Sequence, residues 1–521
     1  MSWITRARRW WRRADFEERL FAVLFGVFAV LALLPIWRAR FLPLLDQPNH
    51  LSSAYIWHHY DDPAARLKEH YHLNIRPVPY FAYYALIRVA AVAASVEVAN
   101  KIVLSAYVLA IPIAGLLFAA RTGRSLWLSL LTFPLAYSYS WAHGFQPFTI
   151  GVAALVLGIG AVDAFLDRPR PGAGAAVLIL VLACALSHPL ALLGLYASAL
   201  ALLAATRPRW RLALTLALLL LPGALLFAWQ LFRPQVSLAE GAIDQEQLYV
   251  GQHPPPWQML RNLPAYTLDS VSGHADLWVF YSVFASAILL LVTGFLRPYR
   301  GAISGGRRGR GAAVFIAMLA CYLVIPLHLT RPIEWWFVSG RFAPLVCFFL
   351  FLLPNGPIRG ARLQLLLPAL AAIAFYPIHI SEKYAAFNRR AEPFVEMVEE
   401  TRPATNILFL SMRPRGDEAV NIDAYHQFGC YIQVLRGGYC ATGWFDHGFP
   451  YKLRSELPAP PWHAHELFNA REHAGPYDYV IVRNESATKP IFDAQVSPEW
   501  RVVRKKGAWT MYAREITLER R

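Results

Sequence analysis

Charged residues are scarce in this 521-residue chain, which has 16% Asp, Glu, Lys and Arg against 56% hydrophobic residues. Soluble globular domains carry roughly a quarter charged residues, so the shortage excludes an ordinary water-soluble protein. Acidic residues are scarcer than basic ones, 34 against 50. A basic excess would suggest nucleic-acid binding in a soluble protein, but here the arginines cluster in short gaps between apolar runs, as in cytoplasmic loops. We therefore expect a membrane protein with no nucleic-acid partner.

Cysteine is also rare, with five in the whole chain. Cys184, Cys321 and Cys347 lie inside apolar runs and are expected to be ordinary buried thiols. Cys430 and Cys440 lie in the polar C-terminal region. A disulfide between them is chemically permitted if that region is extracytoplasmic, and the sequence leaves open whether they are bonded.

Several motifs are missing. The chain has no HExxH metal motif, no glycine-rich phosphate loop after a predicted strand and no long internal repeat. The absences argue against a zinc protease, a P-loop nucleotide enzyme and a solenoid. Five histidines lie in the first polar loop, but their spacing matches no metal motif: His50, His58, His59, His70 and His72.

Long apolar runs dominate the first three quarters of the chain. A spanning helix needs about 20 apolar residues, and an arginine-rich N-terminus precedes the first run like a signal-anchor that is not cleaved. The candidate spans are Phe21–Trp37, Pro79–Val96, Lys101–Ala120, Leu126–Trp141, Phe148–Phe165, Ala175–Ser187, Leu190–Ala205, Leu212–Leu231, Leu277–Phe295, Ala312–His328, Phe342–Leu353 and Leu363–Ile378.

Arginine-rich linkers predict which ends of these helices are cytoplasmic. If all four arginine-rich linkers lie on the cytoplasmic side, the helices from Asp167 onward cross the membrane in consistently alternating directions. The C-terminal region then lies outside. Upstream, an odd number of candidates separates two cytoplasmic ends, so one does not cross; Leu126–Trp141, with Pro134 in its middle, is suspected to be broken or re-entrant. About eleven crossings remain. The four linkers are Asp167–Gly172, Arg207–Arg211, Arg297–Arg310 and Asn355–Arg362.

The predicted fold is an all-α polytopic membrane bundle with a small C-terminal extracytoplasmic α/β domain. Residues 1–380 form the membrane domain, with outer loops at 38–79 and 233–276, and residues 381–521 form the outer domain. Its predicted strands are β-rich runs, and one segment reads as a helix, Trp462–His473. High Arg, Ala and Leu usage favours a bacterial inner (cytoplasmic) membrane. The strands are Asn406–Ser411, Cys430–Leu435, Tyr477–Arg483 and Trp509–Ala513.

The start of the first outer loop, LPLLDQPNHL over residues 42–51, is the most informative stretch. Asp46 and His50 are four residues apart and would share one face of a helix, and Pro48 is tolerated in a first turn. Asp46 could simply cap this helix. Alternatively, a carboxylate at the depth of the lipid headgroups could take a proton from a substrate hydroxyl or hold a divalent cation, Mg or Mn, against a phosphate.

Other outer-face residues are candidates for binding. Arg341 begins a predicted membrane helix, and Arg331 lies just before it. An arginine fork suits phosphate, although snorkelling to the interface is an equal alternative for Arg341. His143 is predicted at an outer helix junction, where it could face the cavity and bind acceptor or sugar, although hydrogen bonding to backbone is the simpler role. The second outer loop offers three carboxylates that could contact sugar or acceptor hydroxyls: Glu240, Asp244 and Glu246.

An acidic residue in the first outer loop, many membrane helices and a C-terminal outer α/β domain together resemble the GT-C superfamily of membrane glycosyltransferases. The protein O-mannosyltransferases and the lipid A aminoarabinose transferases are familiar members. The resemblance covers the architecture of the whole chain and rests on Asp46 as its motif residue. Many relatives carry a second acidic neighbour, where this chain has Gln47.

The resemblance implies transfer of a sugar from a polyprenyl-phosphate donor to a lipid, glycan or protein acceptor in the cell envelope. Asp46 would be the base or a metal ligand, with His50 beside it, and Arg341 and Arg331 would bind the donor phosphate. A transporter or flippase of a lipid-linked glycan is the first alternative, although paired repeats and mid-helix charges are missing. A non-catalytic membrane scaffold is the second, favoured by the missing second carboxylate.

Overall fold

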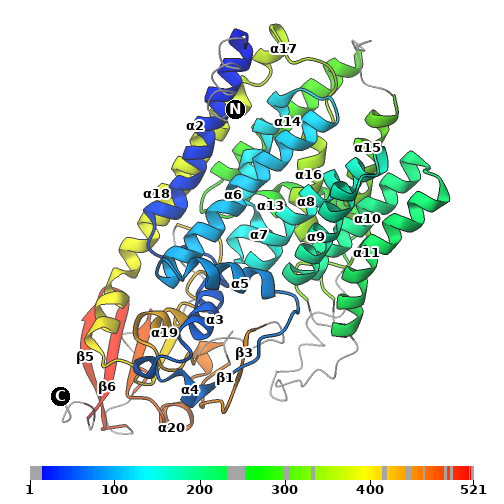
Figure 1. Ribbon diagram of the computed structural model, residues 1–521. Helices are drawn as coiled ribbons and strands as arrows, with labels where there is room; N and C mark the ends of the chain where they lie inside the picture. The colour runs from blue at the N-terminus through cyan, green and yellow to red at the C-terminus, as the bar shows by residue number, and fades with distance from the viewer. Residues whose placement is uncertain are drawn as a thin grey trace.

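The computed structural model describes residues 14–231, 253–296, 305–329, 335–412, 419–441, 449–461, 464–485, 490–492, 497–515 and 517. Most of these residues form helices, and a small sheet lies near the C-terminus. The helical bundle and the sheet occupy opposite ends of the molecule, with the N-terminal end of α2 far from β5 and β6 (Figure 1).

Seven helices in the described part of the chain are long and apolar enough to cross a membrane. The first of them begins with a capping box, in which Asp15 and Glu18 each accept a hydrogen bond from the other's backbone N–H. The seven are α2 (Phe16–Arg38), α6 (Val96–Arg121), α8 (Gln146–Asp167), α10 (Pro189–Thr206), α11 (Trp210–Leu231), α14 (Ala275–Leu296) and the 361–400 stretch formed by α17 (Ala361–Gln364) and α18 (Leu367–Glu400).

The other apolar segments form shorter or irregular elements. The predicted span Pro79–Val96 contains a helix of only ten residues, α5 (Phe81–Ala90). The predicted span Leu126–Trp141 is an unusually long 3₁₀ helix, η2 (Leu126–Tyr137), followed by one turn of α-helix, α7 (Tyr139–Ala142). The remaining shorter elements are α9 (Pro171–Ser187), α13 (Pro256–Thr267), α15 (Gly305–Val324), η3 (Ser339–Phe342) and α16 (Ala343–Phe351).

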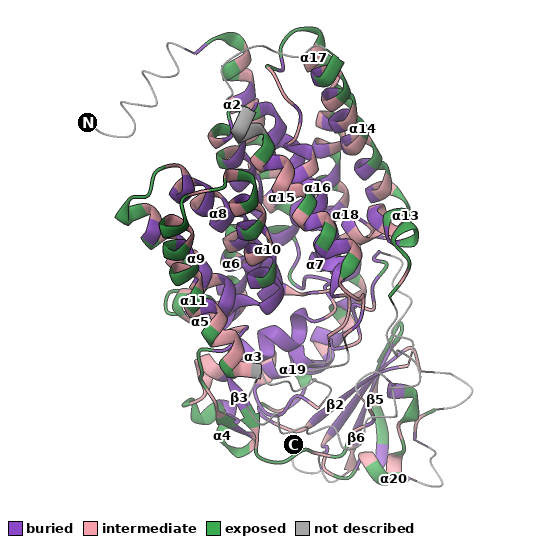
Figure 2. Ribbon diagram, turned by 90° about the vertical axis from the view of Figure 1, so that its right-hand side faces the viewer, coloured by how far each residue is buried: buried purple, intermediate pink, exposed green. Residues whose placement is uncertain are grey.

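The outward faces of these helices are apolar. Val30 of α2 is 71% exposed, and Leu218 of α11 is 59% exposed. Figure 2 shows such exposed residues along the periphery of the bundle, around a buried interior. A wide apolar surface of this kind is stable in lipid and not in water, so the bundle is that of a membrane protein.

Partly buried ion pairs join three helices at the end of the bundle that holds the start of α2. Arg121 of α6 donates from Nε to Asp163 Oδ2 at 2.5 Å, and Arg310 of α15 donates to Asp163 Oδ1 at 2.9 Å. Both arginines also pair with Asp167. Each carboxylate of α8 therefore meets two cations, which compensates the loss of solvation that burial imposes.

The C-terminal sheet has four strands in the order β2-β4-β6-β5, in which β2 and β4 are parallel and the other pairs are antiparallel. Three predicted strands are present, and β5 was not predicted. The predicted strand Cys430–Leu435 is wrong, because these residues form the helix α19 (Cys430–Arg436). The strands are β2 (Ile407–Ser411), β4 (Tyr479–Arg483), β5 (Trp500–Lys506) and β6 (Trp509–Arg514).

The helix predicted at Trp462–His473 is largely absent among the described residues. It is reduced to a 3₁₀ turn, η4 (His465–Leu467), and one turn of α-helix, α20 (Ala470–His473).

The helix α19 forms in place of the predicted strand for a physical reason. The β-rich run Tyr-Ile-Gln-Val-Leu packs against α3 (Gln47–His59), and this tertiary packing overrides the local preference for a strand.

The bundle and the sheet are joined in two ways. Helix α18 continues from the bundle to the sheet, where Trp509 of β6 donates a hydrogen bond to Arg390 O at 2.9 Å. The first loop also contributes a strand, β1 (Tyr71–Leu73), which pairs antiparallel with β3 (Tyr451–Leu453). The first loop and the C-terminal region therefore form one structure at this end of the bundle (Figure 1).

Candidate functional site

The candidate site is built around the turn between α7 and α8, residues 142–145. The backbone N–H groups of Leu45 and Asp46 donate hydrogen bonds to Ala142 O and His143 O, both at 3.2 Å. Gly144 has φ +76°, and a Cβ atom placed on it would lie 2.6 Å from the Asp46 backbone nitrogen. Glycine is required here both by the left-handed conformation and by the close approach of the first loop.

Asp46 lies at the N-cap position of α3 but does not cap it with its side chain. The residue is 7% exposed, and its Oδ1 accepts a hydrogen bond from Gln427 Nε2 at 3.3 Å. The simple capping role that the sequence allowed is therefore not realised. The buried carboxylate faces the C-terminal segment instead.

Arg341 lies in η3, on a segment distant in sequence, and is also 7% exposed. Its guanidinium carbon lies 3.7 Å from the centroid of the Phe145 ring. One terminal nitrogen donates to Trp336 O at 3.0 Å, the other lies 3.1 Å from His188 Nε2, and Nε is buried without a hydrogen-bond partner. The head group does not snorkel to the surface. Arg341 and Asp46 lie close enough to interact electrostatically.

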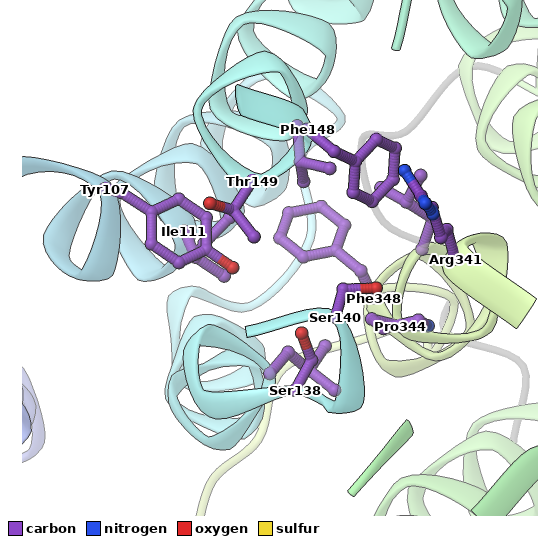
Figure 3. Close-up of a pocket in the computed structure, with 12 residues that line it drawn as sticks. Tyr107, Ile111, Ser138, Ser140, Phe148, Thr149, Arg341, Pro344 and Phe348 are labelled. Atoms are coloured by element: carbon purple, nitrogen blue, oxygen red, sulfur yellow. The ribbon is translucent and has the colours of Figure 1, made fainter. Parts of the chain in front are cut away.

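A narrow cavity opens beside Arg341 (Figure 3). It encloses about 340 Å³ of space when its open mouth is included, although the enclosed part admits only about one water molecule. Ser138, Ser140 and Thr149 bring hydroxyl groups to its wall, and Ser140 Oγ is buried without a hydrogen-bond partner. The rest of the wall is mainly apolar, so Arg341 is the group at this cavity that would suit an anion.

His50 lies on α3 one turn after Asp46, and its ring is directed into a group of aromatic residues. Its Nδ1 is 2.7 Å from the Tyr84 hydroxyl, and the rings of Tyr83 and Phe449 pack around it. Burial lowers the pKa of His50 to about 3. The imidazole is therefore neutral at physiological pH, and the catalytic role expected for it stays a prediction.

The depressed pKa of His50 makes stability sensitive to acid. The unfolded chain binds a proton on His50 below about pH 6.5, whereas the folded chain resists protonation down to about pH 3, so stability falls as the pH is lowered through this window. The loss amounts to roughly 5 kcal/mol across it. We expect His50→Gln to melt at a temperature that depends less on pH between 6.5 and 4.5. Thermal unfolding followed by tryptophan fluorescence measures this.

The exposed His72 provides the control for this experiment. His72→Gln should keep the wild-type dependence of melting temperature on pH. Equal slopes for wild type and His50→Gln would contradict the assignment.

His143 contributes mainly through its backbone, whose oxygen holds the Asp46 N–H. Its ring packs against Tyr139 and Phe337, and Nδ1 lies 3.1 Å from Tyr139 O. Burial, with a smaller contribution from the nearby charge of Arg341, lowers the pKa of His143 to about 4. The neutral ring borders the site and is held by Tyr139.

The remaining predicted residues, Arg331, Glu240, Asp244 and Glu246, lie outside the described residues. Two residues that sequence analysis missed belong to the site. Gly144 could have been suspected from the His-Gly-Phe junction before a proline-initiated helix. Gln427 carries no sequence signal, because a lone glutamine in a loop has no distinguishing pattern.

A resident metal does not fit the side chains around Asp46. No group of three or more His, Cys, Asp or Glu side chains that could hold a metal ion occurs among the described residues. Mg²⁺ and Mn²⁺ prefer several oxygen ligands, and the neighbouring position is Gln47 rather than a second carboxylate.

No known family model and no curated protein matches this chain. The geometry of the site brings a buried carboxylate and a buried guanidinium to the same turn, beside a small cavity whose wall is mainly apolar.

Proposed function

We propose that the chain is a membrane glycosyltransferase of the GT-C type, which moves a sugar from a polyprenyl-phosphate donor to an acceptor at the outer face of the membrane. One observation carries the proposal: Asp46 and Arg341, distant in sequence, are buried against the same turn, residues 142–145. A base and a phosphate-binding cation are the two groups that this reaction needs most.

The chemistry follows from those two groups. An acceptor hydroxyl attacks the anomeric carbon of the sugar, and Asp46 takes the hydroxyl proton as the new C–O bond forms. The bond between the anomeric carbon and the phosphate oxygen breaks, and the polyprenyl phosphate leaves with the electron pair. A one-step displacement of this kind inverts the anomeric configuration.

Arg341 is suited to the leaving group because negative charge grows there during the reaction. The donor phosphate carries one negative charge while it bridges sugar and lipid, and it gains another on departure. A buried cation stabilises the later state more than the earlier one, and it therefore lowers the barrier rather than only binding the donor. The unpartnered Nε of Arg341 and Oγ of Ser140 are the donors offered to phosphate oxygens.

We also propose that the C-terminal domain is extracytoplasmic. Arg121, Arg310 and Arg362 gather at the end of the bundle that begins with α2, as expected for cytoplasmic ends. Cys430 and Cys440 form a disulfide at the other end, and structural disulfides persist in oxidising compartments. A bacterial inner membrane fits both observations.

The same orientation supports eleven crossings, with α5 rather than η2 as the segment that does not cross. A helix of ten residues is about 15 Å long, half the thickness of the hydrocarbon core. A 3₁₀ helix of twelve residues reaches about 24 Å. The ring of Trp127, at the start of η2, packs on Phe21 near the start of α2. The hydroxyl of Tyr137, at the end of η2, donates to Ala32 O near the end of α2.

The proposal is tested with the purified full-length protein in lipid vesicles and a panel of radiolabelled polyprenyl-phosphate hexoses and pentoses. We expect release or transfer of sugar from at least one donor, with one inverted anomeric product. Donor binding with no turnover would overturn the enzyme assignment. Movement of that donor across the bilayer would then indicate the flippase alternative, and no movement the scaffold.

A further inference from the structure

The segment that contacts Asp46 comes from the C-terminal domain. Residues 427–436 lie against the first loop, where the ring of Phe41 packs on Phe428 and Tyr431, at centroid distances of 5.4 Å and 4.5 Å. The Cys430–Cys440 disulfide closes the loop that follows. The packing delivers two buried glutamines, Gln427 and Gln433, to the first loop.

The two glutamines differ in how their amides are bonded. Gln433 accepts from Ser52 and donates to the Tyr71 hydroxyl at 2.9 Å and to Gly438 O at 2.7 Å, so its whole amide is satisfied. Gln427 donates to Asp46 Oδ1 at 3.3 Å, and its Oε1 is buried without a partner. A carboxylate only accepts hydrogen bonds when ionised, so the amide NH₂ of Gln427 must face Asp46.

A buried carbonyl oxygen without a partner costs stability. Each such case in a native fold calls for an explanation. The contact that Gln427 does make is with the carboxylate of the candidate base.

We propose that Gln427 is a positioning residue for Asp46, so that the outer domain completes the active site instead of merely covering it. The kinetic part of this inference rests on the proposed function. An N–H donor favours the ionised form of a carboxylate, and a general base must be ionised to accept a proton. Gln427 thereby keeps Asp46 ionised and fixes the direction of its oxygens.

The test compares the pH dependence of kcat/KM in wild type, Gln427→Leu and Gln427→Glu. Loss of the donor makes Asp46 easier to protonate, and we expect the acid limb to move upward by about one pH unit in Gln427→Leu. Gln427→Glu preserves shape but adds a like charge, and we expect a larger upward shift. Above the limb, the rate of Gln427→Leu should return to within a few-fold of wild type.

Gln433→Leu is the matched control, because it removes a fully bonded glutamine from the same segment without touching Asp46. It should lower the melting temperature and leave the acid limb in place. An unmoved limb in both Gln427 variants, or an equal shift in Gln433→Leu, would overturn the proposal.

A second readout separates this proposal from the proposed function. An apolar carbodiimide modifies carboxyl groups in their protonated form, and mass spectrometry of the full-length protein in lipid measures labelling of Asp46 at each pH. The labelling midpoint should rise in Gln427→Leu whether or not any donor is turned over. If wild type turns over a donor but the labelling midpoint of the variant is unchanged, the positioning role of Gln427 is rejected and the enzyme assignment stands. If the midpoint moves but no donor is turned over, the enzyme assignment is rejected and the positioning role stands.

Discussion

Asp46→Asn is expected to lower the rate of sugar transfer about 10²- to 10⁴-fold while the protein remains folded. Asparagine has nearly the same shape as aspartate but cannot take a proton from the acceptor hydroxyl. The backbone contact of residue 46 with His143 O does not depend on the side chain and should persist. Initial rates with a donor that wild type accepts measure the loss of transfer, and the melting temperature measures whether the fold is kept.

Asp61 supplies the control for this substitution, because it is an acidic residue of the same loop with an 86% exposed side chain. Asp61→Asn should transfer sugar at the wild-type rate. A chelator added in parallel separates a metal ligand from a base, since a base works without a divalent cation. Full activity in Asp46→Asn would remove this residue from the chemistry.

Gly144→Ala is expected to lower transfer about 100-fold or more, because a misplacement of about 1 Å in a catalytic group can cost that much. The added Cβ would lie 2.6 Å from the Asp46 nitrogen and 2.9 Å from the Gln47 nitrogen, both backbone atoms. The first loop must move away from the α7–α8 turn, and it carries the Asp46 carboxylate with it. The left-handed conformation adds a cost of roughly 1–2 kcal/mol for a residue with a Cβ.

Gly160→Ala is the matched control, since Gly160 lies on α8 with nothing within 4 Å of an added Cβ. In a helix interior, alanine is favoured over glycine by roughly 1 kcal/mol, so this variant should be at least as stable as wild type and fully active. Normal activity in Gly144→Ala would mean that the turn does not set the position of Asp46.

The membrane helices were largely predictable, because a long apolar run in a charge-poor chain has few alternatives to a spanning helix. Hydrophobicity does not distinguish an α-helix from a 3₁₀ helix, however, and Leu126–Tyr137 is the segment where that difference appears. The sequence marked this segment as irregular through Pro134. The sequence did not indicate that α5 would be too short to cross, because the apolar run Pro79–Val96 is longer than the helix Phe81–Ala90 that forms within it.

The candidate site was predictable in its single residues and not in its assembly. Asp46 and Arg341 could each be placed near the ends of predicted membrane helices. Their approach to one turn depends on how the helices pack, and no local pattern encodes that packing. Gln427 illustrates the limit, because it lies before a run whose β-rich composition predicted a strand where α19 forms.

The pairing of β1 with β3 joins Tyr71, near the start of the chain, to Leu453, near its end. During synthesis the first loop leaves the membrane long before its partner strand has been translated. The loop must therefore wait, unpaired, until almost the whole protein has been made. The joined structure of the first loop and the C-terminal region can form only at the end of biogenesis, and a chain whose translation stops early would leave β1 without its partner strand.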